Sequence, residues 1–526
     1  MADIDFHNIA ARNGSQRDSF EELCCQLARR TCSENAHFER FRGAGGDGGV
    51  ECIIRHLDGS IIGWQAKFVF DIDGLINQAD KSLKTAITVY KDLAKYIVCF
   101  PFDPTGKTAR LTKTGRSTKS ESEKLDDWVS KATKEAKTNG HDLTIERWPA
   151  SKIIALLLNY DPSGGIRQYF FSESILSVEW FKNHLVTAKH IAGPRYTQAL
   201  NIETVLWKRF SAFSENPEWS DTLTSMLSDC QRTVRTLQQR IDAKGNNELE
   251  PKWPLAELPT VKKHIKKCEE ALVLGQELNA NRSESGLDRL LNSLRLLRAS
   301  FIELENKLAR EIDEQHGKGS ANSKSFRSFM AEYQVSFPAA NLDSVRDVIK
   351  EFDKLAKWLH DPAGYLAFKK AFILTGAGGA GKTHGICDMA FRRLENEKYT
   401  CIVFGHQFSG LPAEWTRIIE SLGLPAILGK DGFLDALNAA GESSGSALIF
   451  IIDAVNETRP RDYWIDRFMP LAYEFEKRPF LKLCVSCRTS FMPVCLPQLD
   501  RYPVIEHRGF SGIERQACNA FLSFTN

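Results

Sequence analysis

Hydrophobic residues recur with different spacings along the chain and divide it into three zones. In residues 1–205, short apolar runs alternate with helical patterns, which predicts an α/β domain. In residues 206–340, apolar residues recur every three or four positions, which predicts a helical linker region. From residue 341 to 526 the α/β alternation returns. The predicted strands are 50–57, 61–70, 96–102 and 143–148 in the first zone, and 371–376, 401–406, 447–453 and 481–487 in the third.

The helical zone is most regular at 221–241 and 286–312, and polar, glycine-containing segments interrupt it at 244–254 and 316–325. No repeat of about 20–50 residues is visible. The fold class that we expect is therefore a multidomain α/β protein in which helices separate two α/β domains.

Composition restricts the class of protein further. No apolar run reaches the ~18 residues of a membrane-spanning helix, and the N-terminus lacks the basic start and apolar core of a signal peptide. The 13 cysteines are scattered singly, which argues against a disulfide framework and indicates a reducing, cytoplasmic environment. The formal net charge of +2 gives no general affinity for nucleic acid, so DNA contacts must come from a local patch.

A phosphate-binding motif begins the third zone. Residues 376–383 read GAGGAGKT, which fits G-x-x-x-x-G-K-[ST] between a predicted strand and a predicted helix. Glycines let backbone N–H groups turn toward phosphate oxygens, and the helix N-terminus adds partial positive charge. Lys382 is expected to reach the β- and γ-phosphates, and Thr383 to bind Mg²⁺. The expected glycines of this ATP site are Gly376, Gly378, Gly379 and Gly381.

Two later strands end in polar residues that suit the same site. The apolar run 447–452 ends in Asp453, whose carboxylate can hold the Mg²⁺ shell, and Glu457 can polarise the attacking water. Arg488 follows the strand at 481–487 and can sense the γ-phosphate. A capping Asp and a surface Arg at strand ends are the alternative interpretation.

A second group of polar residues lies in the first zone. Asp58-Gly59 is a strong hairpin signal, and pairing across it brings Glu51 opposite residues 65–67. Strand alternation places Gln65 and Lys67 on one face. An acid, an amide and a lysine suit metal-dependent phosphodiester hydrolysis, since a carboxylate binds Mg²⁺ and a lysine orients water and offsets developing charge. A small binding domain with a glycine-rich loop is the alternative.

Residues 105–119 contain five basic residues and no acid, which is an arrangement that binds DNA phosphates without sequence preference. A solvated surface loop is an equally good interpretation. The basic residues are Lys107, Arg110, Lys113, Arg116 and Lys119.

The phosphate loop, Asp453 box and Arg488 resemble the STAND NTPases, the class that includes NACHT and NB-ARC proteins. The family box is D-G-x-D-E-like; here it reads Asp453-Ala-Val-Asn456-Glu457, which keeps the final acid and leaves the hydrolysis rate open. The resemblance implies further helical and winged-helix segments, so we expect this chain to be the N-terminal part of a longer protein.

Residues 15–160 resemble the Mrr-like branch of the PD-(D/E)xK nucleases, in which G-x-G-G-x-D is followed by Q-x-K. The acid after Gly-Gly-Val is usually Asp in that branch and is Glu51 here, so Asp47 could serve as metal ligand instead of Glu51 or beside it. The family often has an acid after Phe in its first helix. Phe20-Glu21 fits that position, so Glu21 is expected to complete the metal site, with Glu22 as a weaker candidate.

The combination resembles the bacterial antiviral STAND (Avs) proteins. That resemblance implies a cytoplasmic protein with ATP and Mg²⁺ as cofactors and double-stranded DNA as substrate. It also implies a phage structural or packaging protein as trigger, recognised by a C-terminal region, and assembly into a homo-oligomer, expected to be a tetramer. The domains would be a nuclease at 1–205, a helical linker at 206–340 and a STAND NTPase core at 341–526. The alternatives are a signalling scaffold without cleavage and a restriction endonuclease that uses nucleotide hydrolysis.

Overall fold

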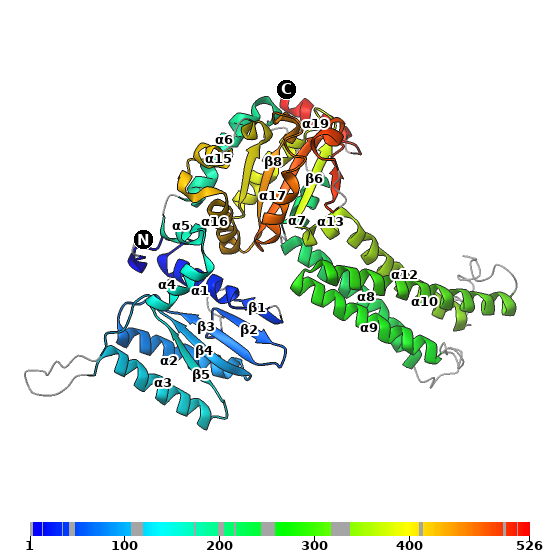
Figure 1. Ribbon diagram of the computed structural model, residues 1–526. Coiled ribbons are helices and arrows are strands. Elements are labelled where there is room, and N and C mark those ends of the chain that lie inside the picture. The colour runs from blue at the N-terminus through cyan, green and yellow to red at the C-terminus, as the bar shows by residue number, and fades with distance from the viewer. Residues whose placement is uncertain are drawn as a thin grey trace, which may run out of the picture.

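A computed structural model shows a multidomain α/β protein with a mixed sheet, a helical middle and a parallel sheet (Figure 1). The described residues are 4–12, 14–33, 35–41, 48–106, 119–172, 175–197, 205–214, 217–242, 258–316, 337–409, 414–497, 501–512 and 514–525. Among them, no helix is both long and apolar enough to cross a membrane.

The N-terminal sheet has the order β1-β2-β3-β4-β5 within the described residues. Its first three strands pair antiparallel and the remaining pairs are parallel. One apolar cluster joins it to α1 and α4, and another joins it to α2 and α3. The bounds are α1 Gln16–Arg30, β1 Ala36–Arg40, β2 Cys52–His56, β3 Ile61–Ala66, α2 Ile72–Val89, β4 Leu93–Cys99, α3 Glu121–Thr138, β5 Thr144–Trp148 and α4 Ala150–Tyr160.

Local sequence signals explain several of these boundaries. Ser15 caps α1 by accepting a hydrogen bond from the Asp18 N–H, and Ser120 and Glu123 form a capping box at α3. Gly59 closes the β2–β3 hairpin at φ +86°, a backbone conformation that favours glycine. The strand predicted at 61–70 is too long, because β3 ends at Ala66. β1 was not among the predicted strands.

Among the described residues, four long helices form the middle of the chain, and they project from the rest of the molecule as a bundle (Figure 1). Their buried leucines belong to an apolar cluster that continues into the parallel sheet. α12 runs through residue 341, so helical structure extends to His360. The interruption predicted at 244–254 lies outside the described residues, and so does the one predicted at 316–325 except for His316, which ends α10. The bounds are α8 Pro217–Asp242, α9 Leu258–Asn281, α10 Glu284–His316 and α12 Phe337–His360.

The C-terminal sheet has the order β10-β6-β9-β8-β7 among the described residues, and all its pairs are parallel. The predicted strands are present, whereas short β10 was not predicted. α6, α7 and α14 share a cluster with one face of this sheet, and α15, α16 and α17 with the other. The bounds are α6 Val178–Ala192, α7 Val205–Phe213, β6 Ala371–Gly376, α14 Lys382–Glu395, β7 Thr400–Phe404, α15 Glu414–Ser421, α16 Gly429–Ser444, β8 Leu448–Asp453, α17 Phe468–Glu476, β9 Leu481–Arg488 and β10 Val504–Glu506.

Two helices from the first zone lie on the C-terminal half. α5 (Gly165–Phe171) packs on α16 so closely that a Cβ on Gly165 would lie 2.4 Å from the Gly432 carbonyl oxygen. α6 packs on β7, where His184 Nε2 accepts a hydrogen bond from the Ile402 N–H at 2.9 Å. The chain therefore contributes two helices to the C-terminal half before it forms the helical bundle.

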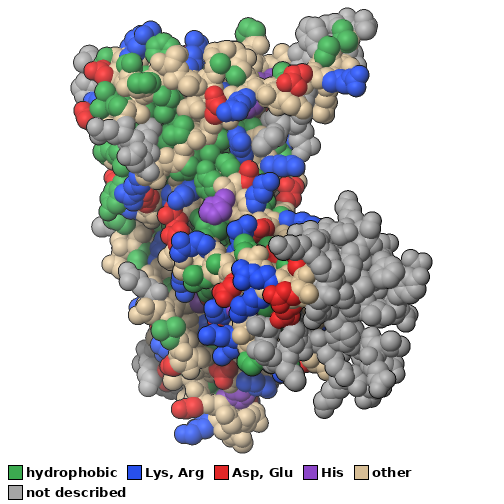
Figure 2. Space-filling view, turned by 90° about the vertical axis from the view of Figure 1, so that its right-hand side faces the viewer, with side chains coloured by type: hydrophobic (Ala, Val, Ile, Leu, Met, Phe, Trp, Pro, Cys, Tyr) green, Lys and Arg blue, Asp and Glu red, His purple; other side chains and the backbone are tan. Residues whose placement is uncertain are grey.

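One face of the molecule carries different kinds of side chain at different heights. Figure 2 views the molecule from the side toward which the bundle projects. Hydrophobic side chains gather there at the height of the parallel sheet, and Lys and Arg side chains are frequent lower down. Val494, Val504 and Phe510 are among the exposed large hydrophobic residues of the C-terminal half.

Candidate nucleotide site and candidate nuclease site

The phosphate loop connects β6 to α14. Gly379 and Gly381 have φ of +78° and +88°, in the left-handed region that glycine enters without strain. A Cβ on Gly376 would lie 2.5 Å from the His507 carbonyl oxygen, so the residue that follows the neighbouring strand β10 leaves room for glycine only. Lys382 Nζ donates hydrogen bonds to the carbonyls of Gly376 and Ala377 at 2.8 and 3.0 Å. Burial lowers the Lys382 pKa, and nearby Asp453 opposes that shift.

Thr383 and Asp453 lie side by side although they are far apart in sequence. Thr383 Oγ1 donates to Asp453 Oδ2 at 2.7 Å, and Ser486 Oγ donates to the other carboxylate oxygen. Asp453 is buried, and the Ala454 N–H donates to Ser486 Oγ at 2.8 Å. A hydroxyl and a carboxylate beside a phosphate loop are the oxygen ligands that Mg²⁺ uses in such sites, so these residues fit the expected ion. Ser486 was not among the predicted residues, although it shares a strand face with Arg488.

Glu457 lies at the mouth of the same pocket between two arginines. Its Oε1 atom is 3.4 Å from Arg195 Nη1 and 4.0 Å from Arg488 Nη2. The Arg488 N–H donates to Asn456 Oδ1 at 3.1 Å, which fixes the end of β9 against the 453–457 box. Ala454 adopts φ +57° and ψ +55°, a conformation that costs a non-glycine residue about 1–2 kcal/mol.

Most of the predicted nucleotide-site residues line one pocket. Its wall is the loop from Gly378 to His384 together with Asp453, Glu457, Ser486 and Arg488. Gly376 lies behind the loop and is not part of that lining. Arg195 lines the pocket as well, and no sequence signal indicated it because it precedes the entire helical middle.

The hairpin brings Glu51 and Gln65 together, and Lys67 directly follows its second strand. The register pairs Cys52 with Trp64, so Glu51 lies opposite Gln65, and Gln65 Nε2 donates a hydrogen bond to Glu51 Oε1. Lys67 is 8% exposed, and its N–H donates to the Cys99 carbonyl at 2.9 Å. Gln65 Oε1 is buried and has no hydrogen-bond partner among the described residues. A buried amide oxygen beside a carboxylate is chemically suited to hold a metal ion or its water.

Neighbouring acids on α1 have different surroundings. Glu21 accepts a hydrogen bond from Arg17 Nε at 2.8 Å, and the pKa of Arg17 is raised first by Glu21 and to a smaller extent by Glu51. Both carboxylates therefore act on one guanidinium, which places Glu21 on the hairpin side. Glu22 is fully buried, pairs with Arg40 and accepts from Gln26 Nε2 at 2.7 Å. Its position is structural.

Other predicted residues cannot be placed. Asp47 lies outside the described residues, as do Lys107, Arg110, Lys113 and Arg116 of the basic run. Lys119 pairs with Asp127. Within the described part of the chain, no group of three or more His, Cys, Asp or Glu side chains is arranged to hold a metal ion.

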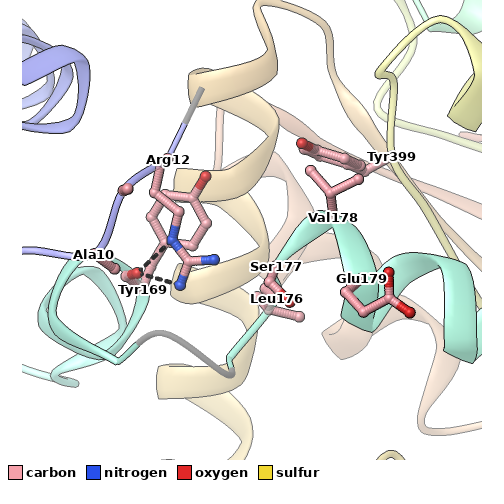
Figure 3. Close-up of a pocket in the computed structure, with 9 residues that line it drawn as sticks. Ala10, Arg12, Tyr169, Leu176, Ser177, Val178, Glu179 and Tyr399 are labelled. Atoms are coloured by element: carbon pink, nitrogen blue, oxygen red, sulfur yellow. Dashed lines mark hydrogen bonds between the residues drawn. The ribbon is translucent and has the colours of Figure 1, made fainter. Parts of the chain in front are cut away.

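Another pocket, of about 300 Å³, lies where the N-terminal segment meets α5, α6 and Tyr399 (Figure 3). Arg12 is buried there and stacks on the Tyr169 ring at 4.6 Å. Its guanidinium donates to the carbonyls of Tyr169, Ser172 and Ile175 at 2.6–3.1 Å. These bonds give the buried guanidinium its partners and join the N-terminal segment to α5 and to the residues just before α6.

No protein-family model matches this chain, and no curated protein sequence is significantly similar to it.

Proposed function

We propose that this chain is an ATP-gated, Mg²⁺-dependent DNA endonuclease of the antiviral STAND type. The observation that carries the proposal is the cluster of Glu51, Gln65 and Lys67 at one end of a hairpin, in a chain that also has a complete phosphate-loop pocket. The restriction-endonuclease-like fold of the first zone and the STAND fold of the third are parts of the same proposal. The mixed and parallel sheets support both assignments.

In the nucleotide pocket, each residue has a separate task. The loop N–H groups and Lys382 bind phosphate oxygens, and Thr383 and Asp453 hold Mg²⁺. Glu457 orients a water molecule toward the terminal phosphate, and Arg488 offsets negative charge there. Ser486 keeps the Asp453 carboxylate in place, because it bonds the oxygen that Thr383 does not use.

At the hairpin, Glu51 would hold the metal ion, with Glu21 and Asp47 as further ligands. Gln65 positions the Glu51 carboxylate through its amide N–H, and the nearly buried Lys67 orients water and stabilises charge on the phosphate. The metal, when bound, lowers the pKa of that water. The positive charge of Lys67 would stabilise the reacting phosphate more strongly here than in open water, because water is partly excluded from this position.

The contacts of α1 offer a route for gating. Its Glu21 faces the hairpin, whereas Gln26 Nε2 donates to the Ala439 carbonyl of α16 at 3.1 Å. Arg29 pairs with Glu442 of α16 at 2.7 Å. Since α16 directly precedes β8, which ends in Asp453, a change at the nucleotide pocket can shift the helix that borders the hairpin site. Binding of a phage protein and assembly of several copies would bias the same equilibrium.

The test is plasmid cleavage by the purified protein with ATP, Mg²⁺ and extract of phage-infected cells as the source of trigger. Wild-type protein is expected to cut supercoiled plasmid, and Glu51→Gln or Lys67→Ala to reduce the rate at least ~100-fold. The matched controls Glu39→Gln and Lys95→Ala change ion-paired residues of the same sheet and should cut normally. Equal cutting by Lys67→Ala would exclude this site, and an intact plasmid with wild-type protein would favour the signalling scaffold.

A further inference from the structure

Arg195 lines the nucleotide pocket, but it belongs to a segment that precedes all strands of the parallel sheet in the sequence. It belongs to the short turn Gly193–Arg195 that follows α6. Gly193 turns the chain at φ +55°, and the ring of Pro194 fixes the φ of the next position. The turn therefore has a defined direction, and it places Arg195 on the pocket wall beside Glu457.

The residues around Arg195 are anchored on both sides. Tyr196 is buried, and its ring lies 5.1 Å from His384 and 5.9 Å from Phe391 of α14, the helix that begins at the phosphate loop. Arg195 Nε donates to the Ala192 carbonyl at 3.2 Å, at the C-terminal end of α6, where a cation is favoured. The backbone at Arg195 is thus fixed to α14, while its Nη1 atom is directed at Glu457.

The residues at the pocket mouth carry more positive than negative charge. Arg195 and Arg488 flank a single carboxylate, that of Glu457, and Lys382 adds a third cation deeper in the pocket. Asp453 is already bonded to Thr383 and Ser486. A second anionic group at the mouth would therefore balance the pair of arginines. Since Glu457 is the residue that would face the terminal phosphate, that phosphate is the group which would compete with Glu457 for Arg195.

We propose that Arg195 discriminates nucleoside triphosphates from diphosphates by exchanging its ion pair with Glu457 for contact with the terminal phosphate. The proposal rests on the nucleotide-binding function proposed above. The exchange frees Glu457 to orient water, so Glu457 becomes available for hydrolysis only when Arg195 has moved to the terminal phosphate. It also makes the position of α6 depend on the terminal phosphate, and α6 belongs to the segment that leads from the mixed sheet to the helical middle.

The experiment measures affinity by isothermal titration calorimetry, with Mg²⁺ and either a non-hydrolysable ATP analogue or ADP. Arg195→Ala is expected to weaken binding of the ATP analogue about tenfold or more and to change ADP affinity less than about twofold. Arg195→Lys should be intermediate, because it keeps the charge without the bidentate geometry. Glu457→Gln should strengthen binding of the ATP analogue, because it releases Arg195. The control Arg501→Ala removes another ion-paired arginine, which lies outside the pocket lining, and should alter neither affinity.

The outcomes separate this proposal from the one on which it rests. Equal loss of ATP-analogue and ADP affinity in Arg195→Ala, or no loss of either, overturns the role of Arg195 and leaves the nucleotide site intact. Absence of binding to wild-type protein overturns the nucleotide site itself. A melting temperature for Arg195→Ala equal to that of wild type excludes misfolding as the cause of a selective loss.

Discussion

The two candidate sites differ in how the fold assembles them. The nucleotide pocket collects residues that follow the carboxyl ends of β6, β8 and β9, and a parallel sheet brings such ends to one edge. The hairpin site depends instead on the antiparallel register of β2 and β3, where a slip of one residue would turn Lys67 to the other face. The geometry of the first candidate site thus follows from strand order, and the geometry of the second from the register of the hairpin.

Their hydrogen bonding differs too. In the nucleotide pocket, both Asp453 oxygens have donors, whereas the buried Gln65 Oε1 at the hairpin has none among the described residues. A satisfied network holds its geometry without a ligand, whereas a buried orphan oxygen gains more from one. We therefore expect a bound metal ion to stabilise the hairpin site more than a bound nucleotide stabilises the nucleotide pocket.

The largest predicted effect tests whether the sites bind independently. Lys382→Ala should weaken ATP binding by about 3–4 kcal/mol, because it removes the buried cation that contacts phosphate. Lys67→Ala should leave ATP affinity unchanged, as should the exposed control Lys430→Ala. Calorimetry with ATP and Mg²⁺ measures all three. Unchanged ATP affinity in Lys382→Ala would contradict the phosphate-loop assignment.

The next prediction concerns the joint between the two regions. Arg12→Ala should destabilise the protein by ~2–3 kcal/mol, because three carbonyls lose a charged donor. Arg12→Lys should lose part of that amount, since one ammonium cannot match the guanidinium geometry. Thermal denaturation provides the measurement, and Arg232→Ala on exposed α8 is the control. An Arg12→Ala protein as stable as wild type would show that the segments hold together without this residue.

The free energy of unfolding is expected to fall by about 2 kcal/mol at acidic pH because of His184, which lies where α6 meets the parallel sheet. Burial lowers the pKa of His184 from 6.5 to about 4 in the folded protein, so the neutral form is the one that packs. Because the unfolded chain binds this proton more readily, its stabilising contribution is complete above pH 6.5 and is lost as pH falls toward 4. The loss is about 1.4 kcal/mol per pH unit, or ~2 kcal/mol at about pH 5.

His184→Gln isolates this contribution, because an amide oxygen can accept the Ile402 N–H without titrating. Melting temperatures measured from about pH 7 to about pH 5 should fall less steeply for the variant than for wild type. Parallel curves would mean that His184 titrates over the same pH range in the folded and unfolded protein, so that burial does not lower its pKa.

The smallest effect concerns Ala454 in the 453–457 box. Ala454→Gly should stabilise the protein by up to ~1 kcal/mol, because glycine removes the left-handed strain while adding some unfolded-state entropy. Ala390→Gly, in the interior of α14, should instead destabilise by ~1 kcal/mol. Chemical denaturation compares the two. Destabilisation by Ala454→Gly would show that the Ala side chain contributes packing that outweighs the strain.

Sequence patterns predicted the long buried strands well and the short strands poorly. β6 and β8 appear as unbroken apolar runs because parallel strands are buried on both faces. β1 and β10 are missing from the prediction, since β1 has a half-exposed, polar composition and β10 has only three residues. The overlong prediction at 61–70 has a related cause, because Phe68 and Phe70 are apolar but pack in ring contacts after the strand ends.

The sequence by itself determined the phosphate loop, the hairpin and the residues at the ends of β8 and β9, because each depends on local geometry or on one pairing. Tertiary structure decided which distant residues join them. Arg195 enters the nucleotide pocket, Ser486 bonds Asp453, and Glu22 faces away from the hairpin toward Arg40 and Gln26. The contacts of Arg195 with Glu457 and of Glu22 with Arg40 depend on how α6 and α1 pack in the folded chain, and the contact of Ser486 with Asp453 depends on the pairing of β9 with β8.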